Sequence, residues 1–96
     1  MARKQFQDVF PDVITQSATI DFGSVADGNE EASDVTVAGA ALGDIVLVSC
    51  GVDLADLQLS ASVTAANTVT LVVSSSGDTV NLAETTYKII VLSPNF

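Results

Sequence analysis

The stretch that decides the fold is residues 57–73, LQLSASVTAANTVTLVV. In its first half an apolar residue stands at every second position, namely Leu57, Leu59, Ala61 and Val63. After the short link at residues 65–67 the alternation returns, with Val69, Leu71 and Val73 on one side. Strict alternation is typical of a strand with one buried face, and two such runs across a short link are typical of a β-hairpin. The stretch therefore predicts two adjacent antiparallel strands.

The rest of the chain favours strands as well. Val, Ile and Thr together make up 28 of the 96 residues, and β-branched side chains suit a pleated surface better than a helix. Further strands are predicted at residues 17–22, 33–37, 45–48 and 86–92, with a short edge strand at 80–82. Turn-rich loops are predicted at 23–31 and 51–56. The predicted fold is all-β, an antiparallel β-sandwich of six to seven strands with a short N-terminal arm.

Two of these predictions concern burial. The unbroken apolar run at residues 45–48 predicts a strand that is covered on both faces or runs through the middle of the sandwich. In the last strand we expect Tyr87, Ile89 and Val91 to point inward, which places Lys88 toward solvent. With no Trp, the core is expected to be aliphatic, with Phe22 and Tyr87 as its large members.

Residues 1–16 differ in character and are predicted to form a docking arm, while residues 17–96 form the sandwich. Phe6, Val9, Phe10 and Val13 have the spacing of an apolar helical stripe, and Pro11 ends any helix near Val9. A frayed terminus is the alternative. Exposed Phe side chains are unfavourable on a free monomer, which favours docking on another subunit. The predicted partner-binding residues are Arg3, Lys4, Phe6, Val9 and Phe10.

Composition excludes several classes of function. Three basic residues against twelve acidic ones give a net charge of −9, which argues against nucleic-acid binding. No apolar run is long enough to span a membrane, and one cysteine rules out an intrachain disulfide. The chain has no His, so the sequence predicts no enzyme, no catalytic residues, no cofactor and no metal site. No apolar region follows the charged N-terminus, so we expect no export signal.

Three groups of residues are candidates for a metal-binding or catalytic site. The loop residues Asp27, Asn29, Glu30 and Glu31 offer oxygen ligands but do not match a calcium loop. The carboxylates Asp53, Asp56 and Glu84 are a conceivable acid–base pair for sugar cleavage, which the scarcity of aromatic residues disfavours. Cys50 has no basic neighbour in sequence and is expected to be inert and at least half-buried.

Four segments together resemble a known domain. They are VTVAGAALGDIVLVS at 35–49, ASVTAANTVTLVV at 61–73, VNLA at 80–83 and TYKIIV at 86–91. In this order they resemble a small β domain of tailed-bacteriophage virion structural proteins, found in capsid decoration proteins, head fibres and tail components. The resemblance covers about residues 17–92 and supplies turn residues, not catalytic ones.

The resemblance implies a capsid decoration (cement) protein that binds the outer surface of the major capsid protein shell and stabilises it. We expect a homo-oligomer, with a trimer favoured, that is assembled in the host cytoplasm and located on the exterior of the virion. A head-fibre or tail-associated virion protein is the first alternative, and an Ig-like carbohydrate-binding attachment module is the second. The surplus of acidic residues either serves solubility alone or keeps an acidic body in water while the arm docks.

Overall fold

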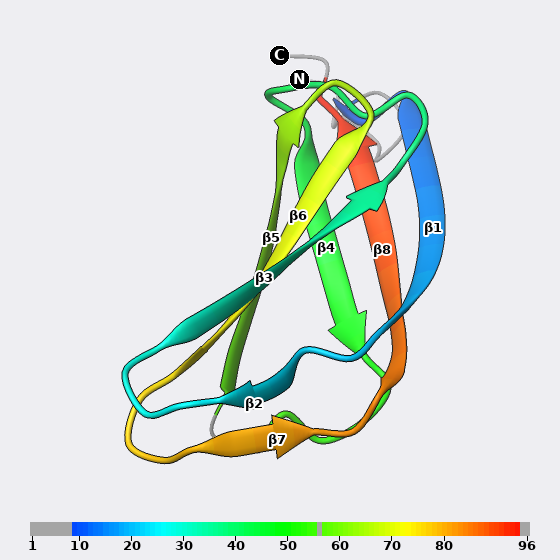
Figure 1. The fold of residues 1–96 in the computed structure, drawn as a ribbon. Helices are drawn as coiled ribbons and strands as arrows, with labels where there is room; N and C mark the ends of the chain where they lie inside the picture. Colours follow the sequence, from blue (N-terminus) through cyan, green and yellow to red (C-terminus); the bar gives the residue numbers. More distant parts are fainter. Residues whose placement is uncertain (1–8, 56, 95–96) are drawn as a thin grey trace, which may run out of the picture.

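Two three-stranded sheets and a two-stranded ribbon are formed by the residues that the computed structural model describes, 9–55 and 57–94. The strands are β1 (Asp12–Ile20), β2 (Gly23–Val25), β3 (Glu30–Thr36), β4 (Ile45–Cys50), β5 (Leu57–Ala65), β6 (Thr68–Ser75), β7 (Val80–Leu82) and β8 (Thr85–Ser93). One sheet has the order β1-β8-β4 and the other β3-β6-β5, while β2 pairs with β7 (Figure 1). Every pairing is antiparallel, so the prediction of an all-β antiparallel sandwich is confirmed.

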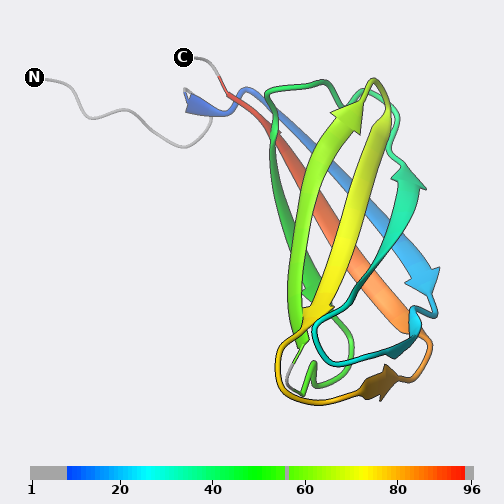
Figure 2. The same ribbon diagram turned by 60° about the vertical axis from the view of Figure 1, so that its left-hand side comes forward.

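The hairpin formed by β5 and β6 confirms the alternation from which it was predicted. Ala61 pairs with Leu71 and Val63 with Val69, and β6 buries every second residue. A β-bulge interrupts the pairing between Val63 and Ala65. This hairpin forms the front layer in Figure 2, with the strands of the other sheet behind it.

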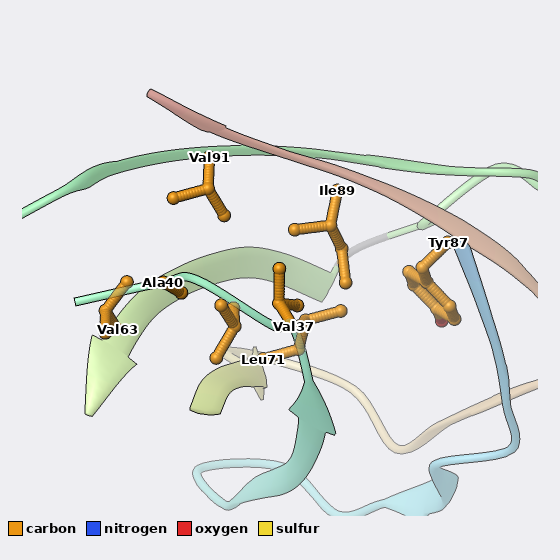
Figure 3. Packing of buried hydrophobic residues seen from close by; sticks show 8 residues of the cluster. Val37, Ala40, Val63, Leu71, Tyr87, Ile89 and Val91 are labelled. Carbon is orange, nitrogen blue, oxygen red and sulfur yellow. The ribbon is translucent and has the colours of Figure 1, made fainter. Parts of the chain in front are cut away.

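The main core lies between the two sheets. From β8 it takes Tyr87, Ile89 and Val91, all at most 1% exposed, as predicted from their spacing. These residues face a second group that comes from β5, β6 and the segment after β3: Val37, Ala40, Val63, Val69 and Leu71. Figure 3 shows four of them, Val37, Ala40, Val63 and Leu71, together with the three residues of β8. The rings of Phe22 and Tyr87 meet edge to face with centroids 5.5 Å apart, which gives the aliphatic core one aromatic pair.

A smaller cluster closes the end of the sandwich that carries the β2–β7 ribbon. Val25 from β2 and Leu82 from β7 pack with Leu57 and Val73 from the main hairpin. Residues 23–25 were predicted to belong to a loop, and that prediction was wrong. A three-residue strand next to two turn signals is too short to show an alternation, and only its pairing with β7 defines it.

The first strand begins at Asp12, five residues earlier than predicted. Asp12 pairs with Ser93 and the pairing continues to Ile20, so residues 12–16 belong to the sheet and not to the arm. The alternation was hidden by Gln16, a polar residue that pairs with the buried Ile89 yet stays exposed because β1 is an edge strand. The predicted helical turn that ends near Val9 lies mostly among residues 1–8, outside the described residues. Within the described residues no helix has the length and apolarity to cross a membrane.

Candidate docking face

The outer surface of the β1-β8-β4 sheet, called the β8 face below, is half apolar. Its outward positions follow from the strand register, because residues directly opposite each other share a face. They form four rows across the sheet: Val13–Leu92–Ile45, Thr15–Ile90–Leu47, Ser17–Lys88–Ser49 and Thr19–Thr86. The first two rows are mostly aliphatic, and within them Leu92, between Val13 and Ile45, is buried (5% exposed). The other two rows carry hydroxyl groups and one lysine.

Strand β4 contributes to this face in a way that corrects the sequence prediction. Its apolar run predicts a strand covered on both faces or running through the middle of the sandwich, but β4 is an edge strand whose Ile45 and Leu47 side chains are exposed. Val46 and Val48 point toward the core, as the pairing with Val91 and Ile89 requires. Periodicity identified the strand, but it cannot say what covers the outer side of a sheet.

The exposed aliphatic side chains gather on this face. Among the described residues, four of the six large hydrophobic side chains that are exposed belong to it: Val13 (48%), Ile45 (38%), Leu47 (53%) and Ile90 (37%). Together they leave about 300 Å² of apolar side chain in water, comparable to the largest patch on an ordinary monomer, which is often functional. Covering that area removes it from water at about 25 cal/mol per Å², a gross gain of about 7 kcal/mol before the entropy of association.

Lys88 stands in the middle of the polar half of the β8 face. The structure confirms that it is exposed and alternates with the buried Tyr87 and Ile89. Two shallow hollows lie on either side of β8, one toward β1 and one toward β4, and Lys88 and Ile90 line both. The first hollow is also lined by Thr15 and Ser17, and the second by Leu47 and Ser49. A partner side chain can enter either hollow beside the ammonium group.

The opposite outer surface, on the β3-β6-β5 sheet and called the β6 face below, has a different chemistry. Its outward positions on β5 are Gln58, Ser60, Ser62 and Thr64, all exposed and all polar. Across the strands the Thr70 hydroxyl donates to Asp34 Oδ1 at 2.6 Å, so the Thr64 hydroxyl, 2.8 Å away, donates to Thr70. A face of hydroxyl and carboxylate groups that satisfy one another is suited to contact with water.

The two turn elements that carried the resemblance lie against each other at one end of the sandwich. Asn67, in the link between β5 and β6, accepts a hydrogen bond from the Gly39 amide on its side chain (2.8 Å) and from the Val37 amide on its carbonyl (2.9 Å). Its own amide donates to the Ala40 carbonyl at 2.8 Å. Gly39 has φ +93°, and a Cβ there would lie 3.1 Å from Ile14 Cδ1, so this position requires glycine. These motif residues act in turns, as predicted.

Comparison with protein-family models, with curated proteins and with solved structures finds no match. The resemblance to phage virion domains therefore stays a prediction.

The predicted arm residues are placed only in part. Arg3, Lys4 and Phe6 lie outside the described residues, whereas Val9 and Phe10 are described and half-buried. Both precede β1 at the end of the sheet where the Val13 row lies. Of the predicted arm, the described Val9 and Phe10 thus directly precede the strand that carries Val13, in the apolar half of the β8 face.

Sequence reasoning missed the exposed residues of that face, namely Val13, Ile45, Leu47 and Ile90. A signal for them was present in the last strand. There Ile90 and Leu92 are apolar at outward positions, where a strand with one side in water carries polar residues.

The other residues weighed as sites have structural partners or stand apart. Asp27 accepts a hydrogen bond from the Gly77 amide at 2.7 Å, which ties two loops together, and Asp53 accepts one from the Ala55 amide at 2.9 Å. Asp56 lies outside the described residues, and Glu84 is exposed. Across residues 9–55 and 57–94, no three potential metal ligands come together.

Cys50 is half-buried and pairs across the strands with Tyr87, whose hydroxyl is buried and has no hydrogen-bond partner within the described structure. Burial, and then the neighbouring Cys50 thiol, raise the pKa of Tyr87 to about 12. The hydroxyl therefore stays protonated at neutral pH. This pair belongs to the core of the sandwich.

Proposed function

We propose that the protein is a virion structural protein, a capsid decoration protein that binds the outside of a phage shell through its β8 face. The observation that carries the proposal is the exposed aliphatic patch on that face, formed by Val13, Ile45, Leu47 and Ile90. An apolar run on both sides of a strand is typical of a strand that is covered on both faces. In β4 the core covers one side, and a partner surface is proposed to cover the other.

The difference between the two outer faces determines how the protein is oriented on the shell in the proposed complex. With the β8 face against the shell, the β6 face and its hydroxyl and carboxylate groups point into solvent. The chain has a net charge of −9, which keeps bound copies from adhering to unrelated particles or to nucleic acid.

The proposed mechanism is stapling of neighbouring shell subunits by many weak contacts. A three-stranded face is small compared with the roughly 800 Å² per partner of a standard stable interface, so a single contact is weak. Copies that are linked to one another on a closed shell gain about 10²- to 10⁴-fold in avidity through effective concentration. A trimer at local threefold positions of the shell matches the symmetry of such an assembly and is part of the proposal.

Sugar binding has less support. The described aromatic residues are Phe10, Phe22 and Tyr87; Tyr87 is buried, and Phe10 and Phe22 are half-buried. Sugar-binding surfaces commonly offer an exposed aromatic ring as a platform, and none of these three rings is fully exposed. Binding of the isolated protein to a glycan array would support a carbohydrate-binding module instead.

The proposal is tested by counting copies of the chain in purified virions of the phage that encodes it. Quantitative mass spectrometry against the major capsid protein is expected to give hundreds of copies per particle. Electron microscopy with an antibody label is expected to show label over the whole shell. Label at one vertex would replace the proposal with a tail-associated or head-fibre protein, and absence from virions would refute it.

A further inference from the structure

We infer that Lys88 is the residue by which the β8 face selects its partner, an apolar shell surface that presents a carboxylate opposite the ammonium group. The inference rests on the proposed function and deepens it by naming the chemistry of the partner surface. It starts from the distribution of charge over the described residues.

Carboxylates are numerous on the chain but absent from the β8 face. None of its outward positions holds an acid, and Lys88 is its single charged side chain. Ser17 and Ser49 flank the lysine across the sheet, and Thr86 and Ile90 flank it along β8. No described carboxylate lies within ion-pair distance of Lys88, although ten of the twelve acids fall among the described residues.

Charge complementarity then decides between the possible occupants. A second copy of this chain would bring another acidic body and, on the same face, another lysine instead of a counter-ion. A partner that carries a carboxylate in one of the two hollows beside β8 would pair with the ammonium, while its apolar surroundings cover Leu47 and Ile90. Such a pair is partly desolvated by the flanking aliphatic groups and contributes more to specificity than an exposed pair does.

The test compares variants of equal charge on isolated shells of the encoding phage from which the native protein has been removed. Lys88→Glu changes the net charge from −9 to −11, and the double variant Gln58→Glu/Ser60→Glu on the β6 face makes the same change. We expect Lys88→Glu to weaken binding to shells at least about tenfold, because it places like charges opposite each other. Lys88→Arg and the β6-face double variant are expected to stay within about twofold of the wild type.

The outcomes separate this inference from the proposal beneath it. Equal binding of Lys88→Glu and wild type would overturn the inference and leave the proposed function standing, whereas failure of the wild type to bind shells would refute both. Sedimentation of the free protein tests whether a second copy of this chain occupies the β8 face instead. A wild-type dimer that Lys88→Glu dissociates and the β6-face variant does not would assign the β8 face to a second copy and overturn the inference. Urea unfolding of each variant shows whether it is folded, as expected for changes at exposed positions.

Discussion

Alkaline titration of Tyr87 tests how the core is packed. Tyr87 is the single tyrosine, and the chain has no Trp, so the near-ultraviolet absorbance of tyrosinate reports this residue alone. Its side chain is fully buried against Phe22, and burial, followed by the neighbouring Cys50 thiol, raises its pKa from the ordinary 10.0 to about 12. We expect the folded protein to titrate near 12 and the urea-unfolded chain near 10.

The same shift predicts how stability depends on pH. Between pH 10 and 12 the unfolded chain loses the tyrosine proton while the folded protein keeps it, so unfolding becomes easier as the pH rises. The difference between a pKa of 10 in the unfolded chain and about 12 in the folded protein corresponds to roughly 3 kcal/mol of unfolding free energy, present in full below pH 10 and lost by about pH 12. Urea unfolding at a series of pH values measures this loss.

Tyr87→Phe is the matched control, because it keeps the ring and removes the hydroxyl. The hydroxyl has no hydrogen-bond partner within the described residues, so the variant is expected to be as stable as the wild type at pH 7, or up to about 1 kcal/mol more stable. Its stability is expected to lack the additional loss between pH 10 and 12. Titration of the folded wild type near pH 10, or a variant destabilised by more than about 2 kcal/mol at pH 7, would refute the account of this core.

Three further predictions concern the faces and the turns. Leu47→Asp is expected to weaken binding to shells about 30-fold, because it removes roughly 80 Å² of exposed apolar side chain, while the unfolding free energy changes no more than for Ser62→Asp on the β6 face. Asn67 has φ +62°, and its side chain accepts a hydrogen bond from the Gly39 amide. Asn67→Ala is therefore expected to lower the unfolding free energy by about 2 kcal/mol and Asn67→Gly, which tolerates this φ, by about 1 kcal/mol, as measured by urea unfolding. Equal losses would contradict the role given to φ. Deletion of residues 1–8 leaves the half-buried Val9 and Phe10 and the whole of β1 in place, so it is expected to reduce shell binding without lowering the thermal midpoint. Full binding of the truncated protein would mean that residues 1–8 are not needed for docking.

The sequence predicted the strands whose two sides differ in chemistry. In β5, and in β8 as far as Ile89, inward-facing apolar residues alternate with polar ones, so both burial and direction followed from spacing alone. Tyr87 inward and Lys88 outward were correct for the same reason. Where one face of a strand is buried and the other is exposed to solvent, apolar and polar residues alternate, and the sequence shows which face is which.

The predictions were wrong where the alternation of apolar and polar residues is interrupted or too short to be seen. Gln16 faces inward at an open edge of the sheet and hid the start of β1, while β2 is too short to alternate. The continuous apolar run of β4 predicts a strand that is covered on both faces or runs through the middle of the sandwich, but β4 lies at the edge of its sheet. Which exposed side chains come together on the β8 face depends on which strands lie next to each other. The order β1-β8-β4 is a property of the tertiary fold.

Hydroxyl-radical footprinting of the protein, free and bound to shells, measures which of its two outer faces is covered on binding. The account predicts that Ile45, Leu47 and Ile90 are oxidised in the free protein and become protected on binding. Oxidation of Val72, on the β6 face, is predicted to be unchanged. Protection of Val72 with continued oxidation of Leu47 and Ile90 would mean that the protein binds through its other face, and the account would be wrong.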